Sequence, residues 1–333
     1  MTQGPTAEAP SPTGAALRFG AVLAASGPVI LTAFGVGRRS VGWFCSAPDL
    51  AGEGPYALES TPGELLFWAV LLLPVLLAGL LLRGSRRATP AAVAAVGVVL
   101  AFGLFTAFFL PGLDPCTARL RAVVPPWPLI VCYPVAAGTL LLAPRPPPAR
   151  GSAPWTPVLW AGAAGAAAWA AMFHRLPITA GRFEVILYAG NTTQSPWDGL
   201  VWWSCDADVI GLPVVLVALA ATAGATAPAR WGRAFGAATA AVLLLSPLLD
   251  LVTYMAQCGD EFPSFLADSV RWNLLVAAGL VAAAIRRPGI SVSRAGAVHL
   301  VRRSWGRAKD LAVVVVIAAA AVWLVVSSFT PTR

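Results

Sequence analysis

The stretch Val201-Trp202-Trp203-Ser204-Cys205-Asp206-Ala207-Asp208 stands directly before a long apolar run at 209–227. A similar stretch, Val41-Gly42-Trp43-Phe44-Cys45-Ser46-Ala47-Pro48-Asp49, precedes another apolar run at 64–83. Each joins aromatic residues to a cysteine and an aspartate ahead of a run. We interpret the two stretches as matching landmarks in two related halves of a polytopic membrane protein.

The apolar runs indicate the class of protein. Hydrophobic residues make up 58% of the chain and charged residues only 11%, against about 25% charged residues in soluble domains. Runs of about 20 apolar residues can cross a hydrocarbon core of about 30 Å, and these runs are too continuous for the alternating strands of a membrane barrel. We expect an all-α protein with about nine transmembrane helices, near 18–36, 64–83, 90–111, 126–143, 156–173, 209–227, 235–256, 272–286 and 311–328.

These runs divide the chain into four parts. Residues 1–17 are rich in Pro, Thr, Ser and Ala, which is typical of a disordered tail. Residues 18–150 and 151–287 form a first and a second four-helix half. Residues 288–333 hold a basic loop and a final transmembrane helix without a counterpart.

Further matches between the halves keep their order along the chain. Beyond the two opening stretches, they pair Leu73-Pro74-Val75 with Leu212-Pro213-Val214, Pro111-Gly112-Leu113-Asp114 with Pro247-Leu248-Leu249-Asp250, and Trp127-Pro128-Leu129 with Trp272-Asn273-Leu274. An even number of helices in each repeat predicts two parallel halves related by an axis along the membrane normal. The alternative is that Leu, Pro, Val and Trp recur by chance in an apolar sequence.

The basic residues predict an orientation. If the amino terminus is cytoplasmic, most of the Lys and Arg residues lie on the cytoplasmic side, in the segments 83–89, 144–155, 228–234 and 286–310. The positive-inside rule therefore favours a cytoplasmic amino terminus and, with nine spans, an extracytoplasmic carboxyl terminus. Arginine greatly outnumbers lysine, and Ala, Gly and Pro are frequent, which is typical of proteins from GC-rich bacterial genomes. We therefore expect the protein to lie in a bacterial inner (plasma) membrane.

The distribution of the basic residues also predicts which partners the protein binds. The net charge of +8 is spread over short loops and forms no patch with its own core, so we expect no nucleic acid as a partner. The loop 286–310 holds an apolar segment beside arginines, which predicts contact with anionic lipid or docking of a membrane or cytoplasmic partner.

Four cysteines fall one per outer loop. We expect Cys45, Cys116, Cys205 and Cys258 to form two disulfides, because thiols outside an inner membrane meet an oxidising compartment. The duplication favours Cys45–Cys116 and Cys205–Cys258, each stabilising by roughly 3 to 5 kcal/mol. Redox work, for which the chain lacks a Cys-X-X-Cys motif, and free or metal-binding thiols are the alternatives.

Two four-helix halves with outer cysteines resemble the plan of the haem A synthases. That family uses several intramembrane histidines, whereas this chain has only His174, near an outer helix end, and His299, in an inner loop. Two histidines on opposite sides of a bilayer cannot bind one metal or haem. We therefore expect no cofactor and no metal site.

Ionisable residues near the outer helix ends are the candidates for chemistry. Charges inside a membrane are costly and are functional candidates by default. Asp250 lies deepest and is a candidate catalytic group with His174, and the alternative is a structural ion pair with Arg121 or Arg271, or a helix cap. Asp206, Asp208 and Asp114 are candidate ligand-binding residues.

The resulting functional hypothesis is a permease or transport-related component that binds a small molecule or lipid between its halves. An intramembrane enzyme or assembly factor at the outer face and a non-catalytic accessory subunit are the alternatives. The chain contains no phosphate-binding Gly-Lys-Ser/Thr loop, no His-Glu-X-X-His and no Gly-X-Ser-X-Gly, which argues against ATP hydrolysis and common hydrolase mechanisms. Whether the protein is an enzyme stays open.

Overall fold

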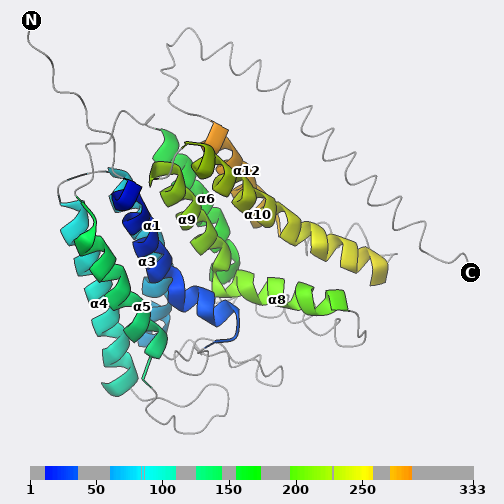
Figure 1. Cartoon of the computed structure of the whole chain (residues 1–333). Helices are drawn as coiled ribbons and strands as arrows, with labels where there is room; N and C mark the ends of the chain where they lie inside the picture. The colour runs from blue at the N-terminus through cyan, green and yellow to red at the C-terminus, as the bar shows by residue number, and fades with distance from the viewer. Residues whose placement is uncertain are drawn as a thin grey trace, which may run out of the picture.

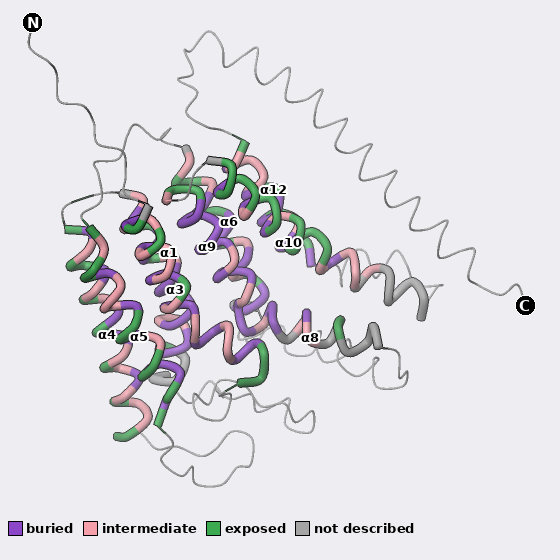
Figure 2. The backbone as a smooth tube through the Cα atoms, viewed as in Figure 1, coloured by how far each residue is buried: buried purple, intermediate pink, exposed green. Residues whose placement is uncertain are grey.

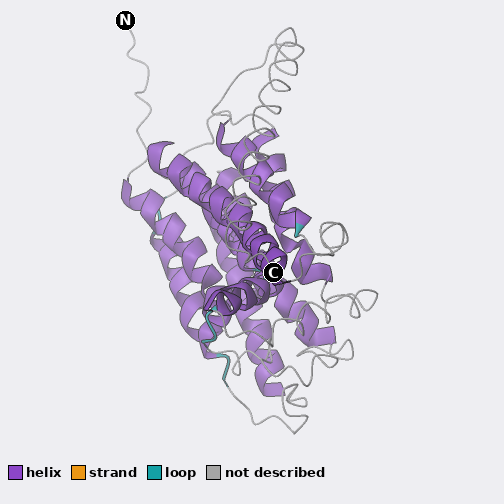
Figure 3. Ribbon diagram, turned by 90° about the vertical axis from the view of Figure 1, so that its right-hand side faces the viewer, coloured by secondary structure: helices purple, strands orange, loops and turns teal. Residues whose placement is uncertain are grey.

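The computed structural model describes the chain as a set of α-helices. The described residues are 12–36, 61–83, 85, 87–109, 125–144, 155–173, 196–226, 229–257 and 271–286. The helices are α1 (Pro12–Ala33), α3 (Thr61–Arg83), α4 (Ala88–Phe109), α5 (Trp127–Leu142), α6 (Trp155–Phe173), α8 (Pro196–Ile210), α9 (Leu212–Thr226), α10 (Ala229–Gln257) and α12 (Trp272–Arg286). No strand occurs among these residues (Figure 3).

The predicted all-α class is confirmed, and the helices fit a membrane protein. Among the described residues, four helices are long and apolar enough to cross a bilayer, or five if the bent pair α8–α9 counts as one span. The expected runs before residue 287 all contain a helix, and the last expected run, 311–328, lies outside the described residues. The expected total of nine spans is thus not established.

Two expected boundaries differ from the structure. Helix α1 begins at Pro12, inside the segment that we expected to be a tail, because Pro12 is acceptable in the first turn of a helix, where its missing N–H has no partner to lose. The expected run 209–227 is not one helix: Gly211 separates α8 from α9, and the two helix axes meet at 68°.

The helices pack as two sets of four. In the first set, α1 and α4 each pack against both α3 and α5, which closes a ring. In the second set, α6 and α10 each pack against both α9 and α12, which closes another ring. Helix α9 joins the two sets through contacts with α1 and α3 (Figure 1).

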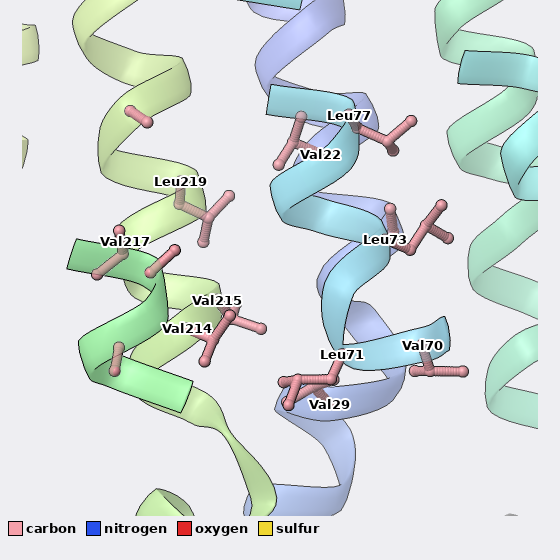
Figure 4. Packing of buried hydrophobic residues seen from close by; sticks show 14 of the residues in the cluster. Val22, Val29, Val70, Leu71, Leu73, Leu77, Val214, Val215, Val217 and Leu219 are labelled. Carbon is pink, nitrogen blue, oxygen red and sulfur yellow. The ribbon is translucent and has the colours of Figure 1, made fainter. Parts of the chain in front are cut away.

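Helix α9 is the central helix of the molecule. Ten of its fifteen residues are buried, as expected for a helix that is apolar on every side and is surrounded by other helices. Aliphatic side chains of α1, α3 and α9 meet in the interface between the sets (Figure 4). The buried residues there include Val22, Val29, Leu71, Leu77, Val214, Val215 and Leu219.

Outward-facing positions of the same helices are also apolar. Figure 2 shows buried residues along the inner faces of the helices and exposed residues along the outer faces. Exposed side chains include Leu72 and Leu76 of α3, Val98 of α4, Val242 of α10 and Val276 of α12. A water-soluble bundle would place polar residues at such positions, whereas lipid tails accommodate these side chains.

Helix α8 lies across the end of the bundle, and we call this end the α8 end (Figure 1). Gly211 has φ +91°, a backbone conformation that glycine adopts without steric cost. A Cβ atom at Gly211 would overlap the side chain of Leu71 in α3. Conformation and packing therefore both require glycine where the chain turns from α8 into α9.

Candidate functional site

The opening stretch of the sequence forms the second half of α8. Ser204 and Asp208 are four residues apart, so the helical repeat places them on one face, and both are buried. Trp203 precedes them and is half-buried. Helix α8 packs against α6 and α10 of the second set and against α1 of the first set, so its two faces contact both sets.

A buried polar cluster connects α8 to the second set. Arg271, the residue before α12, donates from Nη2 to Ser204 Oγ and to Ser246 Oγ of α10, each at 2.8 Å. Its Nη1 donates to the Ser204 backbone carbonyl at 3.2 Å and approaches Asp208 Oδ2 at 3.5 Å. The two serine hydroxyls lie 2.6 Å apart. We call these four residues the Arg271 cluster.

Burial determines the electrostatics of the Arg271 cluster. Side-chain exposure is 8% for Arg271 and 2% for Asp208, and an isolated charge at such a depth would lose several kcal/mol of hydration energy. A charge-assisted hydrogen bond is usually 2.7 to 2.9 Å long, so the Arg271–Asp208 approach is long and the serine contacts are the short ones. The guanidinium is thus stabilised jointly by one carboxylate and three neutral oxygen atoms.

The other face of α8 contacts the first set through Trp203. The Trp203 indole Nε1 donates a hydrogen bond of 3.0 Å to the backbone carbonyl of Ala33, at the end of α1. The last carbonyls of a helix have no partner within the helix, so the indole satisfies one of them. The rings of Trp203 and Phe34 also lie 5.4 Å apart, centroid to centroid.

The structure describes the side chains of only some of the predicted site residues. It brings Asp208 into a buried cluster, as an ion-pair partner of Arg271. Asp206 lies on α8 and Asp250 on α10, but their side chains are outside the described part, so the expected pairing of Asp250 with Arg271 is not tested. His174 and Asp114 lie outside the described residues, and their roles stay predictions.

The cysteine predictions are also untested. Cys205 is half-buried on α8, and its expected partners Cys45, Cys116 and Cys258 lie outside the described residues. Cys132 lies on α5 and contacts α1 at Gly27, where a Cβ atom would meet the Cys132 sulfur. Cys132 thus acts as a small packing residue between α5 and α1.

Sequence reasoning assigned no role to Ser204 or Ser246. Ser204 stood inside the opening stretch, and its spacing from Asp208 is a signal that both side chains share a helix face. Ser246 carries no such signal, because only the packing of α10 against α8 brings it to the cluster. Arg271 was considered as an ion-pair partner of Asp250, and the structure places it beside Asp208.

The described residues contain no group of three or more His, Cys, Asp and Glu side chains that could hold a metal ion. No protein-family model, curated protein or solved structure matches the chain.

Proposed function

We propose that this chain is a transport-related membrane protein that binds a small molecule or a lipid at its α8 end, beside the break between α8 and α9. The observation that carries the proposal is a broken helix with a buried ionic cluster one turn before the break. Asp208 precedes Gly211 by three residues, and Gly211 packs against Leu71 of the first set. The break therefore lies where the two sets meet.

Broken helices support a transport role because they supply polar backbone groups at membrane depth. In many transporters, substrate and ion sites lie at helices that are interrupted, where one repeat faces the other. Such interruptions are tolerated where protein or a water-filled cavity surrounds them. Pro28, Pro74 and Pro247 lie inside α1, α3 and α10 and give further helices that are prone to kink.

The proposed site is at the α8 end and not at the bilayer midplane. Aliphatic side chains of α1, α3 and α9 pack together at the interface between the sets (Figure 4). The hydroxyls of Ser26 and Thr32 on α1 donate to carbonyls of their own helix. The buried ion pair of Arg271 and Asp208 lies instead at the α8 end.

We further propose that the α8 end is extracytoplasmic, in a bacterial inner membrane. The acidic positions of the described helices all lie at this end: Glu64, Asp198, Asp206, Asp208 and Asp250. Apart from Arg271, the described arginines lie at the opposite end: Arg18, Arg83, Arg87, Arg230, Arg233 and Arg286. This arrangement agrees with the positive-inside rule and would expose Cys205 to an oxidising compartment, as the predicted disulfides require.

The order of helix contacts supports the proposal that the two sets arose by duplication. Each set closes its ring in the same order along the chain, first to second, second to third, third to fourth and fourth to first. The alignment of Leu73-Pro74-Val75 with Leu212-Pro213-Val214 also pairs Leu72 with Gly211. Leu71, the neighbour of Leu72, contacts Gly211. Residues at nearly equivalent positions of two repeats meet in this way close to the two-fold axis that relates the repeats.

An accessory subunit is the second candidate, and the exposed face of α10 favours it. Ala234, Ala237, Ala238 and Ala241 are all exposed and follow the helical repeat. Small residues at this spacing let membrane helices approach each other closely. A subunit of this kind would need no water-accessible site at the α8–α9 break.

Cysteine labelling at the α8–α9 break distinguishes the transport-related protein from the accessory subunit. Val209→Cys and Leu212→Cys flank Gly211, and Ala220→Cys, in the buried part of α9, is the matched control. Vesicles are treated with a membrane-impermeant maleimide, and mass spectrometry assigns the label to individual peptides. We expect labelling at positions 209 and 212 well above that at 220. Labelling no faster than at Ala220→Cys would contradict the proposed binding site and favour the accessory subunit.

A competition arm then identifies the ligand class. Anionic phospholipids and a panel of small polar metabolites are added before the maleimide. A ligand bound at the break should slow labelling at positions 209 and 212. It should leave Leu200→Cys, on the exposed face of α8, unchanged.

A further inference from the structure

We propose that α8 is a strap that belongs to the second set, and that Trp203 is the releasable contact by which this strap closes the α8 end against the first set. The inference rests on the proposed function, because a binding site beside the α8–α9 break has to open for its ligand. It concerns Trp203 and Ala33, which the proposed binding site does not include.

The attachment of α8 to the second set is the strong one. It consists of the hydrogen bonds from both terminal nitrogens of Arg271 to Ser204 and the contact of Nη1 with Asp208. Ser246 ties the same guanidinium to α10. Hydrogen bonds to an ionised group are about twice as strong as neutral ones. Releasing α8 from this side would also leave charges buried without compensation.

The attachment of α8 to the first set is weaker. On this side, Trp203 Nε1 donates a neutral hydrogen bond to Ala33 O. The Phe34 ring adds an apolar contact, and Phe34 is itself 62% exposed. Breaking this contact leaves an indole N–H and a helix-terminal carbonyl, both at the end of the bundle, where water can replace the lost bond. No buried charge is disturbed.

The chain connection from α8 to α9 also indicates that α8 belongs to the second set. Helix α8 continues through Gly211 into α9, which packs in the ring of the second set. Any small movement of one set relative to the other therefore carries α8 with the second set. Such a movement acts on the Trp203 contact, which joins α8 to α1, as well as on the apolar packing of α9 against α1 and α3.

The test measures amide hydrogen exchange of the full chain in lipid nanodiscs. Trp203→Phe keeps an aromatic ring beside Phe34 but removes the indole N–H. We expect exchange of the amides of Phe34, Gly35 and Val36 to become about three- to ten-fold faster, the range for one neutral hydrogen bond. Peptides that contain Ser246 or Arg271 should exchange at the wild-type rate. Trp231→Phe, at an exposed position on α10, is the matched control and should change neither region.

Faster exchange confined to the end of α1 supports the strap. Faster exchange at Ser246 and Arg271 as well, or at those residues alone, would show that α8 leaves the second set, which overturns the proposal. Unchanged exchange in both regions would overturn it too, because the Trp203 contact would then not hold α8 to α1. Since no ligand is added, failure here is distinct from failure of the labelling test at the break.

Discussion

Arg271 illustrates how one buried residue defines the α8 end. Its guanidinium lies among Ser204, Ser246 and Asp208 and contacts α8 and α10 at once. The sequence places these residues in three separate segments, and their distances along the chain give no sign of contact. A buried charge without its partners is far more costly than the loss of one neutral hydrogen bond, and this difference can be measured.

We predict that Arg271→Gln lowers the free energy of unfolding by about 3 to 5 kcal/mol, because it leaves Asp208 buried without the arginine. The double variant Asp208→Asn with Arg271→Gln should recover part of this loss. Thermal unfolding in detergent measures both, with Arg230→Gln, an exposed position on α10, as control. Equal losses for the single and the double variant would contradict the ion pair.

Gly211 is the second residue on which the fold depends. We predict that Gly211→Ala destabilises the protein by about 1 to 3 kcal/mol, because an alanine at φ +91° is strained and its Cβ overlaps Leu71. Adding Leu71→Ala should relieve the overlap but not the backbone strain. Gly279→Ala, where no atom lies within 4 Å of the added Cβ, should be close to neutral. Thermal unfolding of the four proteins checks this.

Among the elements, continuous helices such as α3 and α4 were predictable and the break between α8 and α9 was not. Continuous apolar runs indicate helices that cross a membrane because transfer into lipid depends on the length and the composition of the segment. The run 209–227 stays apolar across Gly211, so composition carries no sign of the turn there. Glycine is frequent in this chain, and only its positive φ and its contact with Leu71 distinguish Gly211 from glycines that tolerate a side chain.

The hairpin of α9 and α10 depends on another glycine. A Cβ at Gly232 would lie 2.9 Å from the Ala223 carbonyl oxygen and 3.0 Å from the Gly224 Cα, and backbone atoms cannot move aside as a side chain can. We predict that Gly232→Ala costs about 1 to 3 kcal/mol through this overlap. Gly97→Ala on α4 has open space and should cost nothing measurable. A loss of stability in both variants would point to a general effect of the substitution and not to the α9–α10 contact.

Considered as a whole, the molecule is two four-membered helix rings joined through α9, with α8 across one end. The order of sequence matches predicts two four-helix halves, but it does not predict the asymmetry between the two sets. In the aligned sequence, Pro126 stands where the second half has Arg271, and Leu110 stands where it has Ser246. The Arg271 cluster therefore has no equivalent at these positions of the first half, which is consistent with a specialised second half.

The central claim is that the helices span a membrane with the α8 end outside the cell. Leu200→Cys on α8 and Trp231→Cys at the other end of the bundle are both exposed positions. Intact cells are treated with a membrane-impermeant maleimide, and the label is assigned to each peptide by mass spectrometry. We predict labelling of position 200 in intact cells and of position 231 only after the cells are opened. Labelling of both positions in intact cells, or of position 231 alone, would contradict the account.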